Sequence, residues 1–454
     1  MTYPGHIRAV LTLGLPLIGG YLGEIAIQTT DTVMTGWYGI EALAAVALGT
    51  TYLFVLFIFG SGFALAVMPL VAAFAAKDDE QGIRRATRMG LWLSVGFAAL
   101  ALPLLLGSRP ILLAMGQTEQ VATDAAAYLR IAGWGLLPAL LVMTLKSYLS
   151  ALERTQIVLW IILFAAVING LANYALIFGN WGAPELGVRG AAIASVASHT
   201  VSLLGVVIYI LWALPQHALF VRLWRGDRTM LAQVFDLGWP ISLTSLSEVG
   251  LFAGATVMMG WLGTVPLAAE GIVVQVASVA FILHLGLSNV ATIRAGNAFG
   301  RGDTSHMARG ARVVTAMSLV IGGLTAAVFI VWPDVLIRLF IRPGEEAAAE
   351  ILAIGTALLF MAALFQTVDS VQVIAMGLLR GVQDTRMPMI LAGVSYWIVG
   401  LPCSYILGFP LGYGGVGIWA GLVIALSVAA VLMSARFWLI TIRRLPDEPE
   451  AVAG

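Results

Sequence analysis

The segment Thr32-Val-Met-Thr-Gly-Trp37 returns 224 positions later as Thr256-Val-Met-Met-Gly-Trp261. The same offset holds, without a gap, for the whole of residues 14–88. The other matches are Gly14-Leu-Pro16 with Gly238-Trp-Pro240, Leu43-Ala-Ala45 with Leu267-Ala-Ala269, Asp79 with Asp303, Arg85 with Arg309, Arg88 with Arg312, and Glu24 with Glu248. The chain therefore contains two copies of one unit, which run in the same direction.

The composition places these copies in a membrane. Of the 454 residues, 60% are hydrophobic and 11% are charged, whereas a soluble domain carries about 25% charged residues. The hydrophobic runs are long enough to cross the hydrocarbon layer as helices, and they lack the alternation of membrane-spanning strands. We therefore predict an all-α integral membrane protein. Two copies of an apolar unit are typical of a secondary transporter, whose substrate site is expected between the halves near the middle of the membrane.

We predict twelve transmembrane helices in two pseudo-symmetric lobes of six. They are expected at approximately residues 10–35, 43–75, 89–113, 126–151, 157–179, 187–213, 235–261, 267–299, 312–332, 348–377, 387–408 and 415–440. The predicted domains are an N-terminal lobe (1–214), a cytoplasmic linker (215–234), a C-terminal lobe (235–444) and a polar tail (445–454).

The distribution of basic residues predicts the orientation, because cytoplasmic connectors are rich in lysine and arginine. One set of connectors, with the C-terminal end, holds Lys77, Arg84, Arg85, Arg88, Arg154, Arg222, Arg225, Arg228, Arg301, Arg309, Arg312, Arg380, Arg386, Arg436, Arg443 and Arg444. The opposite set holds Arg109, Arg189, Arg338 and Arg342. With an even number of spans, both termini are expected in the cytoplasm.

Five acidic residues fall inside the predicted spans, where ionisable groups are costly and usually mark an ion or substrate path. Glu24 and Asp31 lie on one face of the first span, seven residues apart, where they could hold a proton or attract a cationic substrate. Glu248 and Asp369 have hydroxyl and amide neighbours, and such hard oxygen ligands suit Na⁺ or a proton. We expect Glu270 to be an interfacial group near a helix N-terminus, which favours an acid.

The remaining polar residues of the spans are given packing or interface roles. We expect His199 and His284 to be structural. We expect Lys146 to extend its ammonium group toward the cytoplasmic surface rather than to neutralise an acid. One cysteine, Cys403, excludes an internal disulfide. The 13 tryptophans and 16 methionines would suit a pocket for flat organic cations, but no single one of them is assigned.

Several separate motifs resemble the multidrug and toxic compound extrusion (MATE) transporters, in particular the bacterial NorM-type branch. The motifs are Thr30-Asp-Thr-Val-Met-Thr-Gly36, Glu248-Val-Gly-Leu-Phe252, Asp369-Ser-Val-Gln-Val373 with Leu379-Arg-Gly381, Gly182-Ala-Pro-Glu-Leu-Gly187 and Ser395-Tyr-Trp-Ile-Val-Gly-Leu-Pro402. The resemblance extends over the full length of the chain.

The resemblance implies an antiporter that exchanges cytoplasmic organic cations for external Na⁺ or H⁺ by alternating access. It implies that Glu248 and Asp369 bind the coupling cation, as metal ligands if that cation is Na⁺. Asp31 is implied in proton coupling or drug binding. Candidate substrate-binding residues are Asp31, Glu24, Gln275 and Phe365. The implied setting is the bacterial inner membrane, and we favour a monomer without an organic cofactor or a nucleic-acid partner.

Two positions depart from the pattern of this branch. A tyrosine can stand four residues before the tenth-span aspartate, but this chain has Phe365, which offers no oxygen ligand. The position after Ala268-Ala269 is often histidine, and here it is Glu270. One oxygen is lost and one carboxyl is gained, so the sequence leaves the choice between Na⁺ and H⁺ open.

Three other functions are less consistent with the sequence than the antiporter. A flippase for lipid-linked sugars would favour a cavity lined by cationic residues, whereas the charges inside these spans are mostly acidic. A membrane enzyme would need a clustered nucleophile or metal set, whereas the five histidines are scattered. A passive channel fits the repeat, with acids in both halves, less well than alternating access. The sequence has no nucleotide-binding glycine loop with its lysine, so uphill transport is expected to use an ion gradient.

Overall fold

The computed structural model describes residues 2–342 and 346–444, and the predicted polar tail lies outside them. Within these residues the regular elements are helical and none is a β-strand. Twelve of the helices described there are long and apolar enough to cross a membrane. The predicted all-α class and the twelve predicted spans are therefore confirmed.

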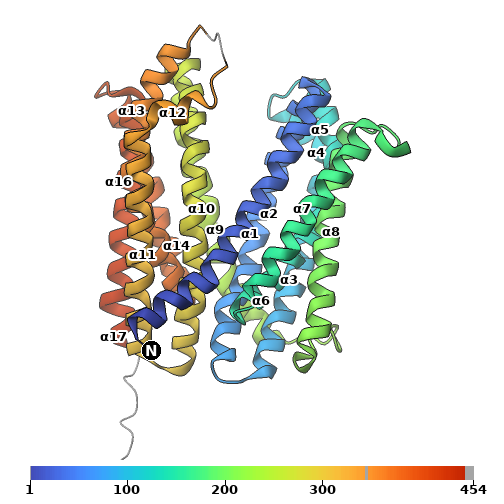
Figure 1. Cartoon of the computed structure of the whole chain (residues 1–454), viewed down its shortest axis with the longest axis vertical. Helices are drawn as coiled ribbons and strands as arrows, with labels where there is room; N and C mark the ends of the chain where they lie inside the picture. Colours follow the sequence, from blue (N-terminus) through green and yellow to red (C-terminus); the bar gives the residue numbers. More distant parts are fainter. Residues whose placement is uncertain (1, 343–345, 445–454) are drawn as a thin grey trace, which may run out of the picture. The chain divides into compact units, whose positions relative to one another are not determined.

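Most of the helices connect in chain order through short turns, and a longer connector joins α8 to α9 (Figure 1). Their bounds are α1 Tyr3–Tyr38, α2 Ile40–Ala75, α3 Glu80–Leu106, α4 Ser108–Ala114, α5 Glu119–Ala132, η1 Gly133–Gly135, α6 Leu136–Ala151, α7 Thr155–Phe178, η2 Asn180–Gly182, α8 Val188–Ala213, η3 Pro215–His217, α9 Arg228–Leu262, α10 Thr264–Arg301, α11 Thr304–Val331, α12 Pro333–Arg338, α13 Ala348–Gly381, α14 Arg386–Gly393, η4 Val394–Gly400, α15 Leu401–Gly408, α16 Gly414–Ala435, η5 Arg436–Thr441 and α17 Ile442–Arg444.

The sequence repeat is visible in the starts of the helices. Helix α10 begins 224 residues after α2, and α11 begins 224 residues after α3. The start of α3 is capped by Asp79, which accepts a hydrogen bond from the Gly82 amide at 2.8 Å. The start of α11 is capped in the same way by Asp303, which accepts from the His306 amide at 2.7 Å. A carboxylate at this position satisfies an amide that has no partner within the helix, so the matching aspartates start matching helices.

The contacts within the chain define two compact units. The N-terminal unit is Leu15–Ser242, and the C-terminal unit is Met1–Gly14 together with Leu243–Gly454. Helices α1 and α9 therefore each begin in one unit and continue into the other. The predicted lobes followed the repeat and did not include this exchange of segments. As functional lobes their boundaries stay a prediction.

The exchanged segments use matching positions of the repeat. In the N-terminal unit, a Cβ atom at Gly238 would lie 2.6 Å from the Phe63 ring, so only glycine lets α9 approach α2 this closely. In the C-terminal unit, a Cβ atom at Gly14 would lie 3.5 Å from the Leu287 side chain. Gly14 and Leu287 are the repeat partners of Gly238 and Phe63. The first segments of the two first helices thus pack against matching positions of the repeat, more closely at Gly238 than at Gly14.

The connector between α8 and α9 is held by α3, within the N-terminal unit. Arg84 donates to the His217 carbonyl at 2.6 Å, and Arg88 donates to the Leu219 carbonyl at 2.7 Å. Arg85 forms an ion pair with Asp227, just before α9. The hydrogen bond from Arg85, with a further one from the Met230 amide, holds the pKa of Asp227 below its usual range. The basic residues of α3 therefore fix the chain where the second copy begins.

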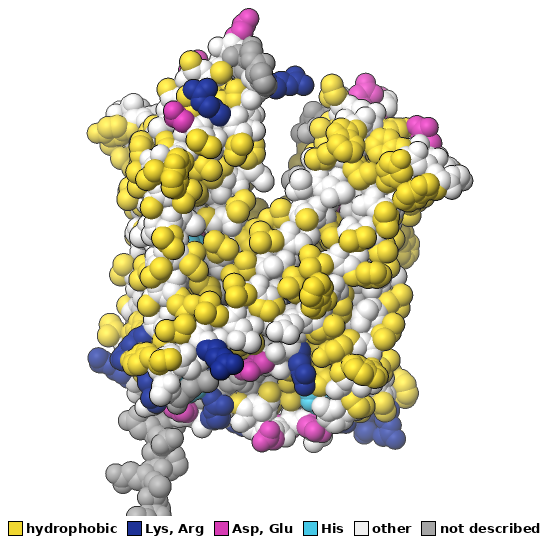
Figure 2. Space-filling model, in the orientation of Figure 1, with side chains coloured by type: hydrophobic (Ala, Val, Ile, Leu, Met, Phe, Trp, Pro, Cys, Tyr) yellow, Lys and Arg dark blue, Asp and Glu magenta, His cyan; other side chains and the backbone are white. Residues whose placement is uncertain are grey.

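The surface of each unit fits a lipid environment. Hydrophobic side chains cover its long sides, whereas Lys and Arg gather toward the ends (Figure 2). Large apolar residues are widely exposed, including Leu100 at 78%, Trp212 at 81% and Val431 at 67%. An apolar surface of this extent is rare on soluble monomers and is expected where side chains face hydrocarbon.

Candidate functional site

Asp369, on α13, is the most buried of the five acidic residues predicted inside the spans. Its side chain is fully buried, and neither carboxyl oxygen has a hydrogen-bond partner among the described residues. In a lobe surrounded by lipid, an ionised carboxylate in this setting is strongly disfavoured. A bound proton or cation would compensate such a charge.

The helix around Asp369 is held by hydrogen bonds from its neighbours. Gln366 donates to the Ala277 carbonyl of α10 at 3.1 Å. Ser318 of α11 donates to the Ser370 carbonyl at 2.9 Å and also bonds to the Nδ1 atom of buried His284 at 2.8 Å. His284 thus helps to join α10, α11 and α13. These bonds hold α13 in place next to Asp369.

Glu248, on α9, is half-buried and lies close enough to Asp369 for the two charges to interact. The structure therefore brings together the two acids that the sequence predicts as a pair. Arg380, on α13, also acts electrostatically on Glu248. One of the hydroxyl residues that precede Glu248 on α9 is already engaged, because Ser242 donates to the Phe59 carbonyl at 2.5 Å.

Phe365 lies one turn before Asp369 and packs against two aromatic rings. Its ring meets Phe252 edge-on with centroids 5.6 Å apart, and Trp419 edge-on at 5.9 Å. It is 4% exposed, so it forms part of the wall beside the acid. At the position where the family can have a tyrosine, this chain therefore has a packed aromatic ring without an oxygen.

Two residues of this region were not predicted as site residues. Gln372 and Tyr396 are fully buried, and the Gln372 amide donates to the Tyr396 hydroxyl at 2.9 Å. Tyr396 lies close enough to Glu248 and Asp369 to interact with both charges. Gln372 follows Asp369 by three residues, so its place on the same face could be read from the sequence. Tyr396 lies on another helix and had no such signal.

The N-terminal unit holds Asp31 in a different environment. Its two carboxyl oxygens accept hydrogen bonds from the Asn173 amide at 2.5 Å and from the Ser195 hydroxyl at 3.1 Å. Asn173 also donates to Asn169 at 3.1 Å. These donors are all uncharged, so they orient the carboxylate without cancelling its charge. Asp31 is thus suited to attract a cation.

Glu24 is paired with a lysine. The Lys146 ammonium lies 2.7 Å from the Glu24 carboxylate and 4.2 Å from the centroid of the Tyr21 ring. The lysine side chain is 5% exposed, whereas that of Glu24 is 43% exposed. The predicted extension of Lys146 to the cytoplasmic surface is therefore wrong, because a carboxylate within reach compensates its buried charge. Glu24 and Asp31 share a helix face, but only Asp31 has uncharged partners.

Glu270 and Gln275, both on α10, differ in exposure. Glu270 is 2% exposed; its Oε1 atom lies 3.4 Å from the Thr256 hydroxyl, and its Oε2 atom has no hydrogen-bond partner within the described part of the chain. An interfacial acid would reach water, so the predicted interfacial position does not match this burial. Gln275 is exposed, and its predicted role in substrate binding stays a prediction.

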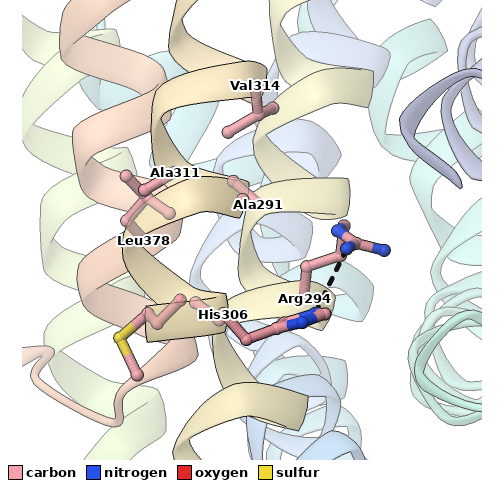
Figure 3. Close-up of a pocket in the computed structure, with 9 residues that line it drawn as sticks. Ala291, Arg294, His306, Ala311, Val314 and Leu378 are labelled. Atoms are coloured by element: carbon pink, nitrogen blue, oxygen red, sulfur yellow. Dashed lines mark hydrogen bonds between the residues drawn. The ribbon is translucent and has the colours of Figure 1, made fainter. Parts of the chain in front are cut away.

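A small pocket lies elsewhere in the C-terminal unit, between α10, α11 and α13 (Figure 3). Arg294 lines it and donates to His306 at 3.3 Å, as the dashed line shows. The same guanidinium group donates to the Nδ1 atom of His6 at 2.8 Å. The pocket lining contains no acid. This cluster fastens the beginning of α1 to the C-terminal unit and is distinct from the acidic site.

The acids do not form a cluster typical of a transition-metal centre. No group of three or more His, Cys, Asp or Glu side chains that could hold a metal ion occurs in residues 2–342 and 346–444. The two acids that interact here, Asp369 of α13 and Glu248 of α9, offer carboxylate oxygens. Such a donor set suits a proton or a monovalent cation bound by hard oxygens.

The fold and these buried acids define a multi-pass α-helical membrane protein with an internal repeat. The family model described as MatE matches the chain twice, over residues 16–175 and 240–406. The two matches begin 224 residues apart, which is the offset of the repeat. The chain belongs to the MatE family.

Two relatives and one solved structure illustrate this membership. A "Probable multidrug resistance protein NorM" of Agrobacterium fabrum is 44% identical over 97% of this chain and 95% of its own length. The protein of the same description from Rhizobium meliloti is 43% identical over 99% and 97%. The fold is similar to an outward-facing multidrug resistance MATE family transporter of the MOP superfamily, with a TM-score of 0.88, 18% identity and 97% of both chains covered.

Proposed function

We propose that the chain is a cation-coupled multidrug antiporter, which exports hydrophobic organic cations in exchange for Na⁺ or H⁺. The observation that carries this proposal is Asp369, a fully buried carboxyl group without a partner among the described residues. Such a group needs a proton or a cation to remain buried. The family membership and the description of its relatives as multidrug resistance proteins support drugs as the substrate.

Coupling follows when the cation and the drug favour different states of the transporter. A proton or Na⁺ at Asp369 and Glu248 neutralises negative charge that otherwise attracts an organic cation. Asp31 accepts hydrogen bonds from neutral donors and is the acid best suited to a cationic drug or to a second proton. Glu24 is less suited, because Lys146 already balances its charge.

The proposed setting is the bacterial inner membrane, with the chain acting as a monomer and both termini in the cytoplasm. The basic connectors of the sequence support this orientation, since such residues are retained on the cytoplasmic side. Alternating access would then expose the acids to the external gradient and afterwards to the cytoplasmic drug. Chemistry on the substrate is not part of this proposal.

Efflux from vesicles tests the proposed function. The purified protein is reconstituted, the vesicles are loaded with ethidium, and a pH gradient or a Na⁺ gradient is imposed separately. Efflux that follows at least one gradient, and that collapses when an ionophore dissipates it, is the expected result. Efflux that does not depend on either gradient would refute cation coupling and would favour a lipid flippase.

A further inference from the structure

Three buried oxygens lie on one face of α13 without hydrogen-bond partners among the described residues. They are both carboxyl oxygens of Asp369 and the amide oxygen of Gln372. The two residues are three positions apart, which places their side chains next to each other on a helix. The Gln372 amide nitrogen is already directed to the Tyr396 hydroxyl. Its oxygen remains available for a ligand.

Tyr396 adds a fourth oxygen from another helix. Because its hydroxyl accepts a hydrogen bond from Gln372, it keeps its own proton to donate and a second lone pair. Tyr396 belongs to η4, a π-helical turn within the α14–α15 span. Such turns insert a residue into the helix and are frequent at functional sites. The tyrosine lies within electrostatic reach of Asp369 and Glu248.

Two glycines let this turn approach Glu248. A Cβ atom at Gly250 would lie 2.6 Å from the Trp397 ring, and one at Gly254 would lie 2.7 Å from the Leu401 side chain. Small residues four apart allow helices in a membrane to come close. Gly250 is two residues after Glu248, and Trp397 is next to Tyr396. Packing of α9 against η4 therefore brings the two helices close together at the level of Glu248 and Tyr396.

We propose that Tyr396 and Gln372 supply neutral oxygen ligands that make the site of Asp369 and Glu248 selective for Na⁺. This inference rests on the proposed cation-coupled function. A proton needs only one carboxyl oxygen, whereas Na⁺ requires several oxygens to replace its water. Phe365 offers none from the preceding turn, and its ring is packed against Phe252 and Trp419. The oxygens come instead from Gln372, on the next turn of α13, and from Tyr396, on another helix.

An equilibrium competition tests this role separately from transport. The purified protein in lipid nanodiscs binds ethidium at pH 7.5, and NaCl replaces N-methylglucamine chloride at constant ionic strength. A second titration lowers the pH without Na⁺. The fluorescence of ethidium reports its displacement in both. We expect Na⁺ and acid each to displace ethidium from the wild type.

The variant Tyr396→Phe removes one oxygen and preserves the ring. We expect the Na⁺ concentration for half displacement of ethidium to rise at least tenfold. The proton concentration for half displacement should change less than twofold. Gln372→Leu should give the same result and decides the case if Tyr396→Phe no longer binds ethidium. The matched control is Tyr405→Phe, on adjacent α15, where the tyrosine is 50% exposed and the Na⁺ midpoint should not change.

Three results overturn the inference. The first is that Tyr396→Phe and Gln372→Leu both keep the wild-type Na⁺ concentration for half displacement. The second is that both variants lose the displacement by Na⁺ and the displacement by acid equally, which a merely structural role would give. The third is displacement of ethidium from the wild type by acid but not by Na⁺, which leaves proton-coupled export standing. If neither Na⁺ nor acid displaces bound ethidium from the wild type, the proposed function itself fails.

Discussion

Removing Glu24 and removing Lys146 from their ion pair should lower the free energy of unfolding by different amounts. The two side chains are 2.7 Å apart, but Lys146 is 5% exposed and Glu24 is 43% exposed. Glu24→Gln therefore leaves an ammonium group buried and uncompensated, whereas Lys146→Met leaves a carboxylate that is half-exposed. Removing one partner of a buried pair costs about 3–5 kcal/mol.

The structure adjusts these magnitudes. The Tyr21 ring, 4.2 Å from the ammonium, offsets about 1 kcal/mol through its cation–π contact, so we expect Glu24→Gln to cost about 3 kcal/mol. Lys146→Met should cost about 1 kcal/mol or less, as for an exposed pair. The double variant should return to within about 1 kcal/mol of the wild type, because neither charge is then left alone.

Unfolding in mixed micelles of dodecyl maltoside and sodium dodecyl sulfate, followed by circular dichroism, measures these free energies. The matched control is Glu119→Gln, which breaks the Arg109–Glu119 pair of the same unit; both of its side chains are exposed, at 42% and 81%. This control should cost about 0.5 kcal/mol or less. Equal costs for Glu24→Gln and Lys146→Met, or a double variant worse than either, would refute the argument from burial.

Three further predictions concern packing, pH and the first helix. Gly377→Ala should cost about 1–3 kcal/mol, because its Cβ atom would lie 2.5 Å from the Ser288 carbonyl oxygen; Gly323→Ala, with no atom within 4 Å, is the control in the same unfolding assay. The Arg85 hydrogen bond lowers the pKa of Asp227. The stabilisation that the ionised Asp227 provides is therefore complete above about pH 4 and is lost as the pH falls through the folded-state pKa. Asp227→Asn should lose less stability than the wild type between pH 5 and pH 2, and an identical acid profile would contradict this. His6→Phe removes an acceptor of the Arg294 hydrogen bond. Amide hydrogen exchange, measured by mass spectrometry, should therefore accelerate in residues 3–14 and stay unchanged in α16. Unchanged exchange in residues 3–14 would show that the cluster of His6, Arg294 and His306 does not hold α1.

The sequence was sufficient for the fold because its signals are local or periodic. The hydrophobic runs predict twelve spans, and Asp79 and Asp303 recur at matching helix starts. The boundaries of the third and ninth spans were less accurate. Polar residues such as Arg84 and Thr304 lie in the first turns of these helices, where a hydrophobicity pattern does not count them.

The candidate site was predictable only in part, because its partners come from distant segments. Buried acids within apolar runs point to Glu248, Asp369 and Asp31, but not to what each one contacts. Lys146 finds Glu24 from 122 residues away, and no periodic pattern encodes that pairing. Tyr396 likewise reaches the site through a π-helical turn and the close packing of α9. These are tertiary features, which a single sequence does not display.

The central claim is that the buried carboxyl of Asp369 holds the coupling cation and gives it up when a drug binds. Release of that cation by the purified protein in weakly buffered detergent, on addition of ethidium, tests it directly. A pH indicator measures protons, and preloaded radioactive sodium measures Na⁺. The wild type and the exposed-acid control Asp334→Asn should both release a cation, and Asp369→Asn should bind ethidium and release none. Release from Asp369→Asn equal to that of the wild type would contradict the claim.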